Sequence, residues 1–264
     1  MKVIDEKDFE ALSPFFRGEK GHRRARFIMK LLAIDKVNNV YGKNGIFKGA
    51  GFASRLLISN HPYGGLDGII LIDLIASLRS DYKLMVNKLL SLVKTMKDNF
   101  ISVTPVGNKK TGITSTSISG IRETLNHLHE GHPVGFFPSG AVSDFSLKDC
   151  KVKDRKWQTS IIHLIRSAKV PVLPIRFFDG NSPFFYFLGL INWRVRILRQ
   201  PSELFNKNDR DARVGIGNII SVEELEHFKD IETFGGYLRK CVYEMPLPSS
   251  FIPKNRIDYS GLIH

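Results

Sequence analysis

The chain has 264 residues, of which 42% are hydrophobic, which is enough for one large core or for one domain with a small extension. It contains no run of about 18 uncharged apolar residues, so no membrane-spanning helix is predicted. The formal net charge of +13 at pH 7 favours a polyanionic partner, either nucleic acid or an anionic membrane face, although many basic soluble enzymes bind neither.

Two further features concern the compartment. The charged stretch Met1–Asp8 lacks the apolar segment of a secretory signal, so no such signal is predicted. Cys150 and Cys241 lie far apart in the sequence and are interpreted as unpaired thiols in a reducing compartment. Neither cysteine has the spacing of a metal ligand.

Residues 1–48 are predicted to form an amphipathic helical extension that contacts a membrane surface. A short first helix is expected within 1–20. A second helix over 21–37 begins with the basic residues Arg23, Arg24 and Arg26. Two interpretations stay open for this second helix: it packs on the core with a solvated basic end, or it lies in a membrane interface with its arginines at the lipid head groups.

A regular alternation of strands and helices follows, and residues 49–245 are predicted to be one domain. Strands are expected at 55–60, 83–87, 99–103, 133–137, 170–177 and 212–216. Helices are expected at about 66–79, 88–97, 118–131, 157–168, from 184 onward, and after Ser221, which forms a capping box with Glu224. This alternation predicts an α/β fold with a mostly parallel central sheet flanked by helices, followed by an irregular tail at 246–264.

Several familiar motifs are incomplete. Gly107 and Gly112 have the spacing of a phosphate-binding loop, but Ile113 occupies the place of the required lysine. Gly215-Ile216-Gly217 lacks the third glycine of a dinucleotide fingerprint. Ser139 is not a nucleophile elbow, because Phe137 stands two residues before it.

A histidine cluster near residue 130 resembles a metal site at first sight. His127 and His129 lie about 200° apart around a helix and therefore face different ways. Together with Glu130 and His132 they are interpreted as the polar end of a helix, where positive charge is favourable, and no metal is predicted.

The segment after the strand at 55–60 carries the candidate site. The strand ends at Asn60-His61-Pro62, and a glycine turn then leads to Asp67 at the start of an apolar helix. One interpretation is structural, with His61 satisfied in the fold and Asp67 capping the helix. The other is a catalytic dyad, in which Asp67 holds one imidazole nitrogen and the other nitrogen takes a proton from an attacking hydroxyl. Since no serine or cysteine lies in a convincing nucleophile context, direct transfer to an acceptor is favoured.

The segment from Asn60 to Gly68 resembles the first sequence block of the glycerolipid (lysophospholipid) acyltransferase superfamily. Most members have four residues between the histidine and the aspartate. Five, with Gly64-Gly65 among them, are typical of the hemolysin-like branch that acylates lyso-ornithine and lyso-glycine lipids. The resemblance covers roughly residues 50–225, and its further blocks occur in order at Phe137–Ser143, Val152–Trp157, Val170–Ile175, Phe178–Tyr186 and Val214–Gly217.

Two departures from the superfamily concern the acceptor. The branch that makes phosphatidic acid carries an arginine in its second block and a glutamate in its third. Here the second block, Ile101–Val106, has no arginine, and Ser139 stands in the glutamate position. The resemblance therefore favours an aminolipid acceptor. A 1-acylglycerol-3-phosphate acyltransferase is the alternative enzyme, and a non-enzymatic basic protein that binds membranes or nucleic acid is the alternative of another class.

The resemblance implies an O-acyltransferase that needs no cofactor and moves a fatty acyl group from an acyl carrier protein or CoA thioester to a lyso-lipid hydroxyl. His61 would be the general base and Asp67 its orienting partner. Backbone N–H groups near Gly140 or the Gly64-Gly65 turn are expected to bind the oxyanion. The enzyme would be peripheral to the cytoplasmic face of the inner membrane and its anionic surface. The residues expected to bind substrate are Asn60, Gly64, Gly65, Pro138, Ser139, Gly140 and Ser143.

Overall fold

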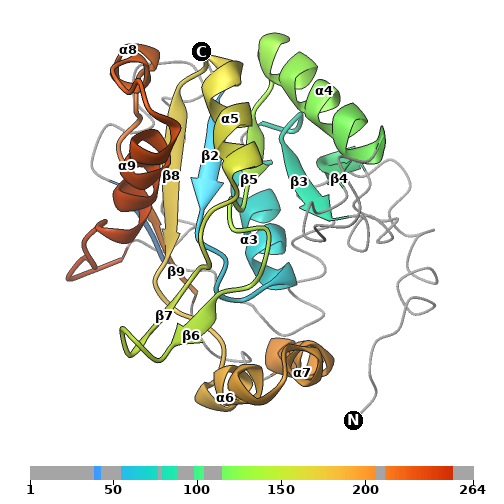
Figure 1. Ribbon diagram of the computed structural model, residues 1–264, viewed down its shortest axis with the longest axis vertical. Coiled ribbons are helices and arrows are strands. Elements are labelled where there is room, and N and C mark those ends of the chain that lie inside the picture. The colour runs from blue at the N-terminus through green and yellow to red at the C-terminus, as the bar shows by residue number, and fades with distance from the viewer. Residues whose placement is uncertain are drawn as a thin grey trace.

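Figure 1 shows the computed structural model, which describes residues 39–42, 55–76, 79–87, 98–103, 115–205 and 212–251. The two helices predicted within 1–37, the helix predicted at 88–97 and most of the tail beyond residue 251 lie outside these ranges. The predicted domain boundary at residue 48 also falls outside them.

A seven-stranded sheet with the order β1-β9-β8-β2-β5-β3-β4 forms the centre of the described structure. The neighbouring strands from β8 to β4 are parallel, whereas β9 runs antiparallel to β8 and parallel to β1. The prediction of an α/β fold with a mostly parallel sheet is therefore confirmed. The strands are β1 (Asn39–Gly42), β2 (Leu56–Ser59), β3 (Lys83–Asn87), β4 (Phe100–Val103), β5 (Val134–Phe136), β8 (Val172–Phe177) and β9 (Arg213–Ile216).

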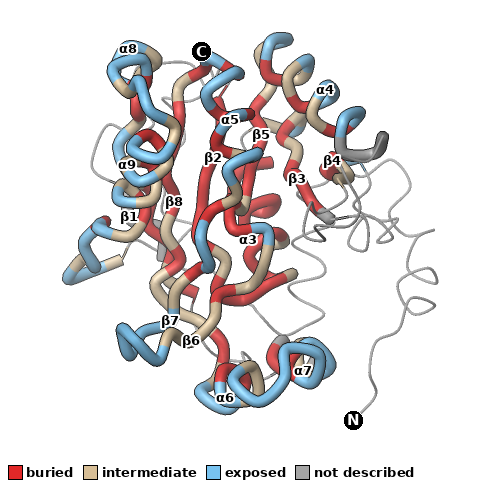
Figure 2. Tube along the Cα trace, in the orientation of Figure 1, coloured by how far each residue is buried: buried red, intermediate tan, exposed pale blue. Residues whose placement is uncertain are grey.

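The central strands are buried on both faces of the sheet, as the red tubes of β2 and β5 in Figure 2 show. Successive side chains point to opposite faces, so Leu57 and Leu173 join one hydrophobic layer, while Leu56, Ile58 and Val172 join the other. This arrangement explains why the strands appear in the sequence as continuous apolar runs rather than as alternating patterns.

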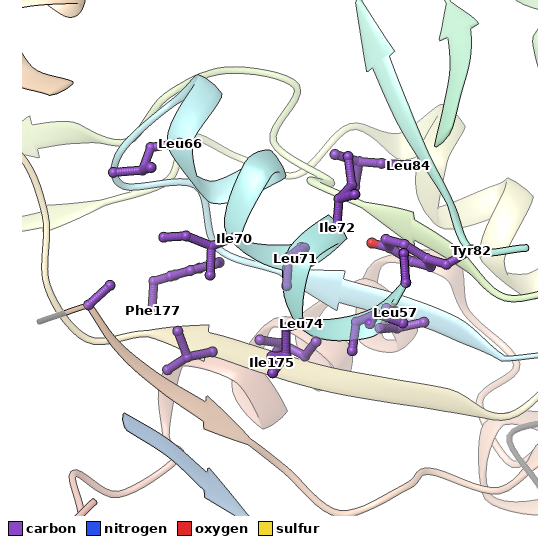
Figure 3. Close-up of a cluster of buried hydrophobic side chains, with 14 of the residues drawn as sticks. Leu57, Leu66, Ile70, Leu71, Ile72, Leu74, Tyr82, Leu84, Ile175 and Phe177 are labelled. Carbon is purple, nitrogen blue, oxygen red and sulfur yellow. The ribbon is translucent and has the colours of Figure 1, made fainter. Parts of the chain in front are cut away.

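The helices cover these two faces. Helix α3 (Gly65–Ile75) is apolar almost all round, and Figure 3 shows its side chain Leu74 near Leu57 of β2 and Ile175 of β8, and Ile70 near Phe177 of β8. The opposite layer receives buried side chains from the helices α4 (Ser115–His129), α5 (Thr159–Ala168), α8 (Val222–Glu226) and α9 (Ile231–Tyr243). The sheet is thus the middle layer of a three-layer domain (Figure 1).

Four elements differ from the sequence prediction. Residues 39–42 fall within the predicted helical extension, yet they form β1 and pair with β9. The segment after Gly140, for which the sequence predicts a polar loop, contains the hairpin of β6 (Asp144–Ser146) and β7 (Lys151–Lys153). The aromatic helix α6 (Pro183–Ile191) is followed by a second helix, α7 (Trp193–Phe205). Finally, Ser221 caps only the short α8, because α9 begins separately at its own N-cap, Asp230.

Candidate active site

The candidate site lies at the carboxyl end of β2, between the ends of β5 and β8. The chain leaves β2 toward β3 and β4, returns through β5, and reaches β8 on the other side of β2. Such a change of direction opens a crevice at the carboxyl edge of a parallel sheet, where α/β proteins bind their ligands. The loops that follow the three strands bring His61, Phe137 and Asn181 to this edge.

His61 and Asp67 are in direct contact. The Nδ1 atom of His61 lies 2.8 Å from Oδ2 of Asp67, and the two side chains are 13% and 0% exposed. The same Oδ2 atom accepts hydrogen bonds of 2.9 Å from the backbone N–H groups of Tyr63 and Gly64. Asp67 is the third residue of α3, and Gly64 is the N-cap. The Asp67 carboxylate therefore caps the start of α3 and also holds the imidazole of His61.

The electrostatics of the pair follow from this burial. Burial raises the pKa of Asp67, while the contact with His61 and the N–H groups of Gly64 and Tyr63 act in the opposite direction. With Nδ1 directed at the carboxylate, Nε2 is the nitrogen that can take a proton from a bound hydroxyl. An imidazolium formed in this way would face the Asp67 carboxylate.

The glycine turn that joins the two residues has room only for glycine at its first position. Gly64 has a φ of +91°, and a Cβ there would lie 1.6 Å from Nε2 of Gln200 and 3.1 Å from Val142. The same Gln200 side chain, from α7, donates to the carbonyl of Tyr63 at 3.3 Å. A Cβ built on Gly65 would instead have open space around it, so the turn is packed on one side only.

The rest of His61 is fixed by residues distant in sequence. Its ring stacks on Phe137 with a centroid distance of 4.1 Å, and its carbonyl accepts a 2.8 Å hydrogen bond from the N–H of Ser143. Its own N–H donates to Oδ1 of Asp154 at 3.1 Å. Two segments, the loop 137–143 and the residues after β7, therefore determine with Asp67 where the imidazole points.

Asp154 is a second buried carboxylate in the site, only 2% exposed. Besides the N–H of His61, its Oδ1 accepts the hydroxyl of Ser143 at 2.6 Å, and its Oδ2 accepts Nε1 of Trp157 at 3.2 Å. In the sequence, Asp154 and Trp157 belong to the block Val152–Trp157 of the family resemblance, which predicts no role for them. The spacing Asp-x-x-Trp is the signal that could have identified the contact.

Asp154→Asn is expected to lower kcat about tenfold, because the amide has a single acceptor oxygen, so that either the bonds from His61 and Ser143 or the bond from Trp157 is lost. The apparent KM for the acceptor should stay near the wild-type value, since Asp154 acts through His61. Steady-state kinetics with a thermal melt as folding control measure both quantities. Asp149→Asn, at an exposed carboxylate of the hairpin, is the matched control, and a wild-type kcat for Asp154→Asn would show that this network does not position the histidine.

Two of the residues predicted to bind substrate use their polar atoms within the protein. The Asn60 amide donates to the carbonyl and accepts from the N–H of Phe177, both at 2.8 Å, and so continues the pairing of β2 with β8. The Ser143 hydroxyl is bound to Asp154. A role of either side chain in binding substrate stays a prediction.

The predicted residues 138–140 form a tight turn next to His61. The Ser139 hydroxyl donates to the carbonyl of Ala141 at 2.8 Å, and the N–H of Gly140, at a φ of +63°, donates to the carbonyl of Phe137. The carbonyl of Pro138 accepts from the N–H of Gln158 at 2.9 Å. The N–H groups of Gly64 and Gly140, expected as oxyanion donors, thus already have acceptors in Asp67 and Phe137.

A cavity of about 500 Å³ adjoins the active-site loop. The loop lines it with Asn60, Pro62 and Ser143. Three other lining residues are cationic, namely Lys151, Lys153 and Arg176, and one, Asp179, is anionic and paired with Arg213. The cavity therefore combines closeness to the His61 loop with a positive charge that suits an anionic group of a ligand.

The histidine cluster lies at the opposite, amino edge of the sheet. Ligand atoms of His127, Glu130 and His132 come within 4.8 Å of one another. However, His127 Nε2 lies 2.8 Å from the carbonyl of Asp81, and His132 Nδ1 lies 2.5 Å from its carboxylate. Burial would raise the pKa of Asp81, but hydrogen bonds from Arg79 and His132 outweigh it and lower the pKa to about 2. The cluster thus joins the end of α4 to the start of β3.

Within the described ranges, no helix combines the length and the apolar character needed to cross a membrane.

Comparisons with known proteins agree on one family. The sequence profile of the family described as Acyltransferase matches residues 23–248. The lyso-glycine lipid O-acyltransferase of Bacteroides thetaiotaomicron is 23% identical over 195 residues, which cover 71% of this chain and 68% of that protein. The lyso-glycine lipid O-acyltransferase of Phocaeicola vulgatus is 22% identical, with coverages of 71% and 67%.

A solved structure shares the fold. The 1-acyl-sn-glycerophosphate (LPA) acyltransferase PlsC from Thermotoga maritima superposes with a TM-score of 0.52, covering 90% of this chain and 80% of that one. The two sequences are 15% identical, so this likeness concerns the architecture alone.

Proposed function

Because the chain belongs to the acyltransferase family, we propose that it is a lysolipid O-acyltransferase in which His61 and Asp67 activate the acceptor hydroxyl. One observation carries the assignment of these residues. His61 Nδ1 lies 2.8 Å from the fully buried Asp67 carboxylate at the carboxyl edge of the sheet, and the imidazole presents its other nitrogen for proton transfer.

In the proposed reaction, the acceptor hydroxyl attacks the carbonyl carbon of an acyl thioester while Nε2 of His61 takes its proton. The resulting imidazolium is stabilised by the Asp67 carboxylate. When the tetrahedral intermediate collapses, the carbon–sulfur bond breaks, and the imidazolium returns its proton to the departing thiolate. The products are the ester and the free thiol carrier, and His61 is neutral again.

Direct transfer, without an acyl-enzyme, agrees with the positions of the nucleophilic side chains. The hydroxyls of Ser139 and Ser143 donate to Ala141 and Asp154 rather than to His61. Cys150 lies in the exposed hairpin and donates to the carbonyl of Leu147. None of these contacts is to the imidazole of His61, the base of the proposed pair.

A lyso-aminolipid with a free carboxylate is the proposed acceptor. Two relatives carry the name lyso-glycine lipid O-acyltransferase. The positions at which the phosphatidic-acid branch holds a phosphate lack its charged residues, since Ser139 replaces the glutamate. The cationic lining of the cavity beside Ser143 suits a carboxylate head group. The donor is an acyl carrier protein or CoA thioester, both of which are anionic and match the +13 charge of the chain.

Acceptor competition tests the proposal. The purified chain is given lyso-glycine lipid or lysophosphatidate, each with acyl carrier protein and CoA thioesters, and diacylated products are quantified by mass spectrometry. The expected kcat/KM is at least about tenfold higher for lyso-glycine lipid, a difference of about 1.4 kcal/mol in transition-state binding. A preference for lysophosphatidate would make that lipid, and not a lyso-aminolipid, the acceptor. Transfer to neither lipid would contradict the lysolipid proposal.

A further inference from the structure

Helices α6 and α7 carry an unusual outer surface. Most of the large apolar side chains that the described residues leave exposed belong to these two helices. Ile191 is 66% exposed and Leu198 is 80% exposed, and the same surface includes Phe184, Phe187, Trp193 and Ile197. We call these six residues the outer apolar face; Figure 2 shows the exposed segments of α6 and α7 in blue. A helix on a water-facing surface normally shows polar residues outward, and contiguous apolar patches mark interaction sites.

The inner side of the same helices is tightly bound to the active-site loops, so the apolar exposure does not reflect loose attachment. Arg196, 5% exposed, donates to the carbonyl of Ser143 at 3.1 Å and pairs with Asp144. Gln200 binds the carbonyl of Tyr63. The outer apolar face is therefore rigidly linked to the segments that hold His61.

The charged residues beside the outer apolar face indicate the chemistry of its partner. The acidic residue of α6 and α7 is Glu203, which is 1% exposed and accepts the hydroxyl of Ser182 at 2.6 Å. An exposed cation of this surface is Arg194, whose guanidinium lies 5.5 Å from the ring of Trp193. Arg199 is half-buried; it pairs with Glu203 at 3.7 Å, and its guanidinium lies 5.5 Å from the ring of Phe184. Aliphatic and aromatic side chains with arginines beside them are typical of a protein surface seated in an anionic lipid interface.

We propose that the outer apolar face of α6 and α7 binds the surface of an anionic lipid bilayer and holds the carboxyl edge of the sheet against it. In Figure 1 both helices lie beyond the ends toward which β2 and β8 point, which is the edge that carries His61. A lipid acceptor could then reach the site without leaving the membrane. This consequence rests on the proposed function, whereas the binding surface is measured without any transfer reaction.

Vesicle flotation tests the surface. The full chain is mixed with vesicles of equal parts phosphatidylcholine and phosphatidylglycerol, and with vesicles of phosphatidylcholine alone. Ile191→Glu combined with Leu198→Glu is expected to reduce the partition coefficient on anionic vesicles at least about tenfold, because two apolar side chains are lost and two negative charges are added. Leu247→Glu, at an exposed leucine outside the two helices, should leave partitioning unchanged. Arg194→Gln should lower the preference for anionic over neutral vesicles about fivefold.

Each outcome is decisive for the surface. Unchanged flotation of the double variant, with a wild-type melting curve, would overturn the proposal, as would a wild-type chain that does not float with anionic vesicles. If the double variant changed the oligomeric state in sedimentation but not the flotation, the face would be an interface between two copies of the chain. A chain that floats as expected but transfers no acyl group would contradict the proposed function and leave the surface intact.

Discussion

His61→Ala is expected to lower acyl transfer by about 10²–10⁴-fold, the usual contribution of a general base. The variant removes the nitrogen that accepts the hydroxyl proton and returns it to the thiolate. The fold should persist, because Asp67 keeps the hydrogen bonds from the N–H groups of Tyr63 and Gly64. Steady-state rates and far-ultraviolet circular dichroism measure the two effects.

The matched control for this variant is His163→Ala, which replaces an exposed histidine of α5. It should transfer at the wild-type rate. A His61→Ala chain that is folded and retains more than about a tenth of the wild-type kcat would remove the imidazole from the mechanism.

Asp67→Asn is expected to reduce kcat by about 10²–10⁴-fold, which corresponds to about 3–5 kcal/mol for breaking a buried ion pair. The N–H groups of Tyr63 and Gly64 both need an acceptor at the position of Oδ2, so the amide oxygen should take that place. The asparagine would then still orient His61. What is lost is the negative charge that stabilises the imidazolium during the reaction.

Asp67→Asn is therefore expected to lower kcat and to leave the KM for the acceptor nearly unchanged. Asp81→Asn provides a control, because Asp81 also contacts a histidine, His132, but lies at the amino edge of the sheet. That variant should change stability and leave kcat unaltered. If the two asparagine variants were equally active, the charge of Asp67 would have no catalytic part.

The central strands could be predicted because their signal is local. Runs such as Leu56-Leu57-Ile58 are apolar, short and ended by proline or glycine, and burial on both sheet faces requires such runs. β1 is different, since the sequence Asn39–Gly42 contains no apolar run and its strand form depends on pairing with β9, about 170 residues further along. The hairpin of β6 and β7 is mostly polar and short, so its residues are equally typical of a loop.

In the active site, too, contacts within one short segment could be predicted and contacts between distant segments could not. His61 and Asp67 are six residues apart, so a turn alone can bring them together, and the pair was predicted. Asp154 and Gln200 come from loops and helices roughly 90 and 140 residues away, and their contacts exist only because the sheet places β2 next to β5 and β8. Sequence spacing cannot indicate such contacts. It also could not show that the amide of Asn60 is occupied by Phe177.

The most direct test of the account measures thiol release from the acyl thioester by the purified chain, with and without lyso-glycine lipid. The predicted result is release that depends on the acceptor, with one thiol formed per ester, and that falls with His61→Ala in proportion to the ester. A burst of one thiol per enzyme without acceptor would reveal a covalent acyl-enzyme. Either that burst, or release by His61→Ala at the wild-type rate, would contradict direct transfer by the His61–Asp67 pair.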